Sequence, residues 1–156
     1  ELFKIAAKVN IVHVPYKGGG ENFAALIGGQ IQMLIISVPT ALQFVNSGRM
    51  RALAVTTDGK RAPSMPNVPS MSEAGVSGMT IYVWFGFVGP AGIPKAIVNK
   101  LHAEVVKALA ASSVKNQFTG RDAELVGSSP AEFSKLIHNE LQRWAEVIKS
   151  AGITAR

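Results

Sequence analysis

Three successive glycines, Gly18, Gly19 and Gly20, separate a strand-like segment from a helix-like segment, and this placement restricts the fold more than any other feature. Residues 10–14, before the glycines, are rich in β-branched side chains and predict a short strand. Residues 23–27, after them, are compact and apolar and end at a Gly-Gly pair, which predicts a helix. A strand, a glycine-rich turn and a helix in that order are typical of a layered α/β protein.

The glycine-rich turn has the chemistry of an anion site. The first N–H groups of a helix have no partner within the helix and carry a partial positive charge, so an anion is their natural occupant. Glycines 18 to 20 permit positive φ angles and the close approach of a ligand, and Lys17, which follows Tyr16, adds a charge at the rim. A tight connection without a ligand is the alternative. Neither glycine fingerprint of nucleotide-binding proteins is present.

The first half of the chain repeats this alternation. Residues 31–36 form an apolar run typical of a strand buried on both faces. A polar break follows, and residues 41–45 predict a second helix that Ser37 or Thr40 can cap. Residues 51–57 predict a third strand. The order of these elements favours an α/β architecture with right-handed crossovers.

The second half begins with an irregular stretch and becomes mainly helical. Residues 62–69 contain three prolines and predict a surface loop, and residues 79–88 predict an aromatic strand. A four-turn helix is expected after Pro94. A five-turn helix is expected to begin at the capping box that Ser129 opens and to end before Gly152. Shorter elements are expected at residues 1–8 (helix), 70–74 (helix), 114–118 (helix) and 123–126 (strand).

Composition excludes several classes of function. The net charge is +6, but the basic residues are scattered, and Lys60-Arg61 is the one adjacent pair, so we expect no nucleic-acid partner. There are no cysteines, which excludes disulfides and cysteine metal sites. No apolar run approaches the ~20 residues needed to cross a bilayer.

No catalytic constellation is evident. The three histidines lie on different predicted elements, most carboxylates fall on helix faces, and the G-x-S-x-G motif is absent. We therefore expect no enzyme activity, no metal and no cofactor. What remains is a set of polar, glycine and aromatic positions at strand ends, where open α/β sheets bind ligands. The candidate ligand-binding residues are Tyr16, Lys17, Gly18, Gly19, Gly20, Ser37, Thr40, Trp84 and Phe85. For Trp84 and Phe85, packing in the core is the alternative.

Seven motifs occur in the order found in one known family. The chain resembles the periplasmic substrate-binding receptors of tripartite tricarboxylate transporters, also called Bug receptors, through essentially its whole length. The motifs are VPYKGG (14–19), GGQ (28–30), GRMRALAVT (48–56), PNVP (66–69), EAG (73–75), WFG (84–86) and GPAGIP (89–94).

The resemblance implies an α/β fold of the type II periplasmic binding proteins, in which two lobes joined by crossover strands enclose a small carboxylate. Residues 1–80 would be part of the second lobe, on the ligand-cleft side, and residues 81–156 a crossover strand and the helices that complete the first lobe. The family's signal peptide and two of its ligand loops are not seen in this sequence. The implied function is that of a periplasmic receptor with membrane transporter subunits as partners.

Two further expectations follow. Gln32 stands where relatives usually have an aspartate, which would alter the preferred carboxylate. A partial lobe would also leave apolar helix faces uncovered, so we expect the chain to self-associate, with residues 79–94 as a hinge for exchanging the C-terminal helices. The alternatives to a receptor are an interaction or assembly module without a ligand and, less favoured, an enzyme.

Overall fold

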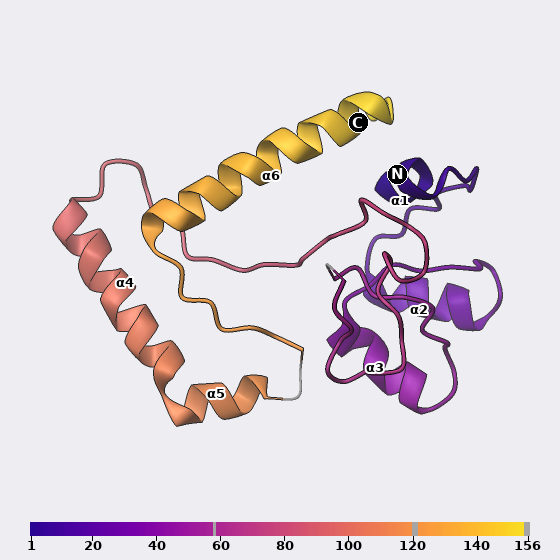
Figure 1. Ribbon diagram of the computed structural model, residues 1–156, viewed down its shortest axis with the longest axis horizontal. Coiled ribbons are helices and arrows are strands. Elements are labelled where there is room, and N and C mark those ends of the chain that lie inside the picture. The colour runs from indigo at the N-terminus through magenta and orange to yellow at the C-terminus, as the bar shows by residue number, and fades with distance from the viewer. Residues whose placement is uncertain (58, 120–121, 155–156) are drawn as a thin grey trace. The chain divides into compact units, whose positions relative to one another are not determined.

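The computed structural model describes residues 1–57, 59–119 and 122–154, and helices are its regular elements (Figure 1). The chain divides into two units, Glu1–Val83 and Trp84–Arg156. The assignment of residues 1–80 and 81–156 to two lobes stays a prediction. The helices are α1 (Leu2–Ala7), α2 (Gly19–Ile27), α3 (Val38–Asn46), α4 (Lys95–Ala110), α5 (Ser112–Phe118) and α6 (Pro130–Ser150).

The described residues contain no β-strand, so the individual strand predictions are wrong for this structure. Those predictions were residues 10–14, 31–36, 51–57, 79–88 and 123–126. A strand is stable only when its N–H and C=O groups pair with a neighbouring strand. Such pairing is reduced here to one isolated parallel bridge, between Val55 and Ser70. Residues 70–74, predicted to be a short helix, form a turn.

The first unit nevertheless brings two predicted β segments, 51–57 and 79–88, and the irregular residues 69–71 together around Val55. The Val55 N–H donates to the Pro69 carbonyl at 2.9 Å, and the Met71 N–H donates to the Val55 carbonyl at 2.8 Å. One residue further on, the Ile81 N–H donates to the Thr56 carbonyl at 2.9 Å. The third predicted strand therefore contacts a segment of the chain on both sides, without a continuous ladder.

The core of the first unit lies beside these contacts. Val55, Ala62 and Met65 are buried together, and apolar side chains of α3 pack against them. Ala62 and Met65 belong to the proline-containing stretch that the sequence predicts to be a surface loop. This stretch is irregular, as expected, but it also anchors the core.

Helices α2 and α3 are joined by two aromatic rings. Phe23 of α2 and Phe44 of α3 stack with ring centroids 4.6 Å apart and an interplanar angle of 22°. Phe23 is 8% exposed and Ala25, on the same helix, is also buried. Because this contact fixes α2 against α3, it positions the start of each helix, where the candidate ligand residues lie.

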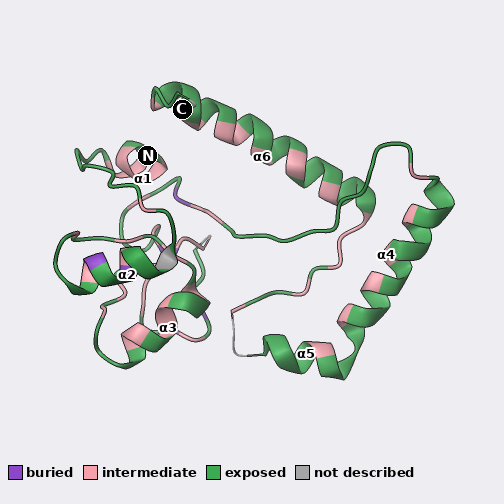
Figure 2. Ribbon diagram, turned by 180° about the vertical axis from the view of Figure 1, so that it is seen from behind, coloured by how far each residue is buried: buried purple, intermediate pink, exposed green. Residues whose placement is uncertain are grey.

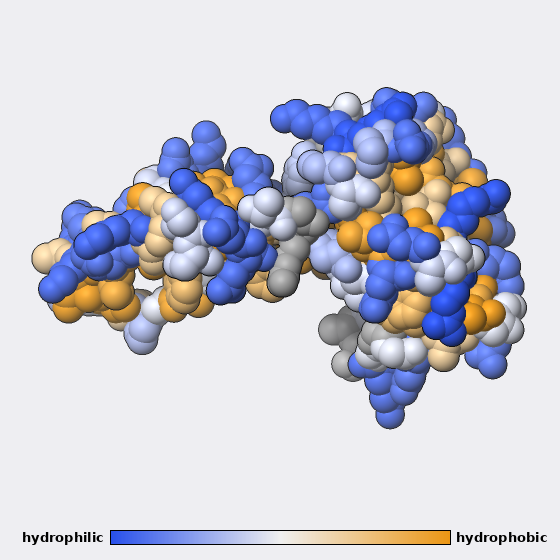
Figure 3. Space-filling model, turned by 90° about the horizontal axis from the view of Figure 1, so that it is seen from below, coloured by the Kyte–Doolittle hydropathy of each residue, from blue (hydrophilic) through white to orange (hydrophobic). Residues whose placement is uncertain are grey.

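The second unit exposes its helices. None of the described residues from 84 to 154 is buried, and the ribbons of α4, α5 and α6 carry only exposed and intermediate residues (Figure 2). Hydrophobic side chains lie at the molecular surface in the space-filling view (Figure 3).

Trp144 is half-buried, and its indole N–H donates to Glu140 at 2.7 Å. Replacing Trp144 with alanine should therefore cost less than the about 3–5 kcal/mol of a fully enclosed aromatic residue.

The capping box of α6 forms as predicted. The Glu132 N–H donates to Ser129 Oγ at 3.3 Å, and the Ser129 N–H donates to Glu132 Oε2 at 2.8 Å. Ser129→Ala should destabilise α6 by about 1 kcal/mol, because it removes an acceptor from the first turn. Thermal melting followed by circular dichroism measures this loss. Ser134→Ala, at an exposed position inside the same helix, is the matched control, and an equal effect of both substitutions would contradict the prediction.

Candidate functional site

The start of α2 is an open helix terminus. Gly18 is the N-cap residue, Gly19 and Gly20 begin the helix, and no side chain caps them. A Cβ atom built on Gly18 or Gly20 would meet no other atom within 4 Å. The first-turn N–H groups have no partner within the helix. This terminus therefore has the space and the polarity to receive an anionic group.

Gly18, Gly19 and Gly20 do not use the positive φ angles that the sequence analysis allowed for them. Gly18 has an extended backbone with φ of −172°, and none of the three glycines has a positive φ. The helix begins at Gly19, four residues earlier than residue 23. What the glycines provide is the absence of side chains around the first turn, rather than a left-handed turn.

A carboxylate already lies at this terminus. Glu21, in the first turn of α2, accepts a hydrogen bond from the Lys17 backbone N–H with an N–O distance of 3.4 Å. Both residues are exposed, and Tyr16 beside them is half-buried. This hydrogen bond is long and exposed to solvent, so it is weak.

The start of α3 holds the two predicted hydroxyl residues. Ser37 is the N-cap residue, but its side chain accepts no bond from the helix backbone, so its predicted capping role is wrong. Its hydroxyl lies 2.7 Å from the Thr40 hydroxyl instead, because Pro39 offers no N–H and the Thr40 N–H donates to the Ser37 carbonyl at 3.1 Å. Both hydroxyls are exposed. No hydrogen bond among the described residues links Ser37 or Thr40 to residues 16–20.

Trp84 and Phe85 belong to the second unit. Trp84 packs edge-on against Phe133 of α6, with ring centroids 5.4 Å apart and an interplanar angle of 83°. Phe85 is 93% exposed, so the alternative of core packing is wrong for it. A ligand role for Trp84 and Phe85 stays a prediction.

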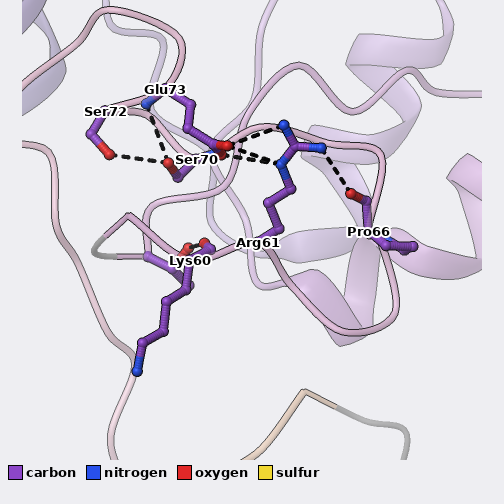
Figure 4. A network of polar contacts seen from close by, with 7 residues as sticks. Lys60, Arg61, Pro66, Ser70, Ser72 and Glu73 are labelled. Atoms are coloured by element: carbon purple, nitrogen blue, oxygen red, sulfur yellow. Dashed lines mark hydrogen bonds and ion pairs between the residues drawn. The ribbon is translucent and has the colours of Figure 1, made fainter.

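A polar network around Glu73 was not found from the sequence (Figure 4). Arg61 donates from Nε to Glu73 at 3.1 Å and from Nη1 to the Pro66 carbonyl at 3.1 Å. The N–H of Ser70, whose exposed fraction is 0%, donates to Glu73 Oε2 at 2.7 Å. The spacing Ser70-x-x-Glu73 is that of a capping box, which was the signal available in the sequence. The network closes the loop that carries Ala62 and Met65.

This network makes the loop sensitive to acid. The hydrogen bond from Arg61, followed by the one from the Ser70 N–H, lowers the pKa of Glu73 from its usual 4.5 to about 2. Because the folded pKa is depressed, the ionised carboxylate stabilises the loop above about pH 4.5, and this contribution is lost as the pH falls toward 2. We expect the protection of the Ser70 amide, which is the slowing of its hydrogen exchange relative to an unfolded chain at the same pH, to fall as the pH is lowered through that window. Glu73→Gln should remove the pH dependence, and an unchanged pH profile in that variant would contradict the assignment.

A hollow of the first unit lies away from the candidate site. It has a volume of about 200 Å³ and is lined by residues that include Thr57, Ser72, Ser77 and Thr80, and none of the predicted ligand residues lines it.

Asn22 of α2 has an enclosed Oδ1 atom without a hydrogen-bond partner in the described structure. Sequence reasoning missed this acceptor, which lies one turn into the helix that begins at the candidate site.

A metal site, a membrane-spanning helix or a histidine paired with a carboxylate would each indicate a particular function. They include no group of three or more His, Asp or Glu side chains able to hold a metal ion. None of the described helices combines the length and apolar character of a bilayer-spanning helix. His102 contacts the Gly127 carbonyl at 3.3 Å, and no carboxylate contacts it in the hydrogen bonds of the described part.

Comparison with known proteins gives consistent matches. A family model described as the tripartite tricarboxylate transporter family receptor matches residues 1–153. A relative from Pseudomonas sp. (strain P51), the UPF0065 protein in the tcbD-tcbE intergenic region, is 34% identical over 94% of this chain and 44% of its own length. The chain thus spans about half the length of this curated relative.

Two solved structures share the fold. The periplasmic binding protein BugD has a TM-score of 0.79 and 31% identity, over 98% of this chain and 52% of its own. MatC from Rhodopseudomonas palustris with bound malate has a TM-score of 0.75 and 30% identity, over 94% of this chain and 51% of its own. These likenesses confirm the predicted fold class, because the matched part of each structure belongs to a periplasmic α/β binding protein.

Proposed function

The chain belongs to the tripartite tricarboxylate transporter receptor family, and from this premise we propose that it serves in an extracytoplasmic receptor that binds a small carboxylate for such a transporter. The family and the matched structures are binding proteins rather than enzymes. Membrane transporter subunits are the partners that the family description implies, and the periplasm is the compartment in which such receptors act.

The observation that carries the proposal is the open terminus of α2. Its uncapped N–H groups, the free space at Gly18 and Gly20, and the positive side chain of Lys17 all favour a carboxylate. The Glu21 carboxylate accepts a hydrogen bond from the Lys17 backbone N–H, just before this terminus. MatC, which has the same fold over half of its length, holds malate, a small dicarboxylate.

We assign distinct tasks to the predicted residues of the first unit. The N–H groups at Gly19 and Gly20 bind one carboxylate group, and Lys17 neutralises its charge. Ser37 and Thr40, whose hydroxyls are exposed and paired only with each other, offer donors for a second polar group. The family resemblance implies an aspartate at position 32, so the neutral Gln32 of this chain makes the unit less negative and would alter the preferred carboxylate.

The charge of Lys17 provides the first test. Lys17→Met keeps the length of the side chain and removes its charge, so we expect weaker binding of malate and a smaller loss of affinity with added salt. Isothermal titration calorimetry measures both quantities. Lys60→Met, at another exposed position of the same unit, is the matched control. Equal affinities for the Lys17 variant and the unmodified chain would exclude this side chain from the site.

A further inference from the structure

Lys17 and Glu21 carry all the formal charge of the stretch of sequence that contains the starts of α2 and α3. Between positions 9 and 48 the sequence holds no other Lys, Arg, Asp or Glu residue. Both side chains are exposed. The charge that this stretch presents to a ligand at the proposed carboxylate site therefore depends on one positive and one negative side chain.

The two charges do not form an ion pair within the described structure. Glu21 accepts its hydrogen bond from the backbone N–H of Lys17, with an N–O distance of 3.4 Å, and none of the ion pairs of the described residues joins it to the Lys17 ammonium group. The Glu21 carboxylate is thus held on the N-terminal side of the first turn of α2. The Lys17 side chain can approach a ligand without first breaking an ion pair with Glu21.

The spacing along the chain indicates how near Glu21 would lie to a ligand carboxylate. The Gly19 N–H, to which we assign that carboxylate, follows the Lys17 N–H by two residues and so lies at most about 7 Å from it. In water, two unit charges separated by about this distance change a binding equilibrium by about threefold. Each further carboxylate on the ligand adds to the repulsion. Glu21 therefore opposes a highly charged ligand more than a weakly charged one.

The start of α3 brings no positive charge that would offset this repulsion. Ser37 and Thr40 offer two exposed hydroxyls 2.7 Å apart, which donate to or accept from a polar group but carry no charge. One ammonium group and two hydroxyls suit a small hydroxy acid with one or two carboxylates. A ligand with three carboxylates would find too few positive partners here.

We propose that Glu21 is a specificity-determining residue of the carboxylate site, whose charge disfavours tricarboxylates and favours small hydroxy acids with one or two carboxylates. This proposal rests on the proposed function, because it requires that a ligand carboxylate binds at the start of α2. Lys17 attracts the anion, and Glu21 limits how much negative charge the bound anion carries.

Malate and citrate form a matched pair of probes, because both are hydroxy acids and they carry two and three carboxylates. By isothermal titration calorimetry at low ionic strength, the unmodified chain should bind malate more tightly than citrate. Glu21→Gln keeps the shape of the side chain and removes its charge, so it should strengthen malate binding by about threefold or more and citrate binding by a larger factor. Glu104→Gln makes the same change of charge at an exposed position of α4 and should alter neither affinity.

Glu21→Asp separates the charge from the hydrogen bond, because the shorter side chain keeps the charge and loses its reach to the Lys17 N–H. It should retain the preference for malate, whereas a purely structural role predicts that Asp disturbs the site and Gln does not. An equal gain for malate and citrate in Glu21→Gln, or no gain, would overturn the proposal. If neither chain binds malate, the proposed function fails and the role of Glu21 with it. If both bind malate equally, the role of Glu21 alone fails.

Discussion

Phe23→Ala is expected to reduce the free energy of unfolding of the unit Glu1–Val83 by about 3–5 kcal/mol, the range for truncating a buried phenylalanine. The ring is 8% exposed and stacks on Phe44 at 4.6 Å, so its loss leaves a cavity and separates α2 from α3. A folded domain is stable by only about 5–15 kcal/mol, so this substitution should remove much of the stability of the unit.

Urea unfolding followed through the amide signals of the first unit measures this loss. Val12→Ala is the control, because its side chain is 87% exposed and substitutions of surface residues usually change stability by less than about 0.5 kcal/mol. A Phe23→Ala variant within the range of the control would show that the aromatic stack does not hold α2 against α3.

Gly19→Val is expected to weaken malate binding by about tenfold or more, while the unit stays folded. Lost hydrogen bonds to a charged group cost about 1.5–3 kcal/mol, which corresponds to this loss of affinity. Gly19 is the first residue of α2, and a β-branched side chain there would screen the first-turn N–H groups from a ligand. Valine has a higher helix propensity than glycine, so this substitution carries no propensity cost in the helical backbone.

Calorimetric titration with malate measures the affinity, and thermal melting checks the fold. Ala24→Val introduces the same side chain at an exposed position of the same helix and should bind malate normally. If both variants bind equally well, the glycine-rich turn is not part of the ligand site.

Because helix signals are local, most helices were predicted, although the one expected at residues 70–74 is a turn. Ser129 and Glu132 mark the start of α6 within four residues, and Gly28 ends α2 where the sequence predicts. The helix that begins at Gly19 was placed four residues too late, because glycine has low helix propensity and was taken for a turn. In the structure the start of α2 includes Gly19 and Gly20 in spite of the low helix propensity of glycine.

Strands could not be predicted in the same way, because their stability depends on distant partners. Residues 51–57 have a strand-like sequence, but in the structure only Val55 and Thr56 find backbone partners, at residues 69, 71 and 81. Residues 84–88 have an aromatic, strand-like sequence and find no backbone partner among the described residues. Arg61 and Glu73 are twelve positions apart, so their ion pair also depends on the fold and not on a local pattern.

The most direct test of the proposed function is a titration of the isotope-labelled chain with malate, followed by the amide signals of each residue. The account predicts saturable shifts at residues 17–21 and at the start of α3, around Ser37 and Thr40, with little change in the hollow that Thr57 and Ser77 line. It would be contradicted by saturable shifts confined to that hollow, or by the absence of any saturable shift at residues 17–21 up to millimolar malate.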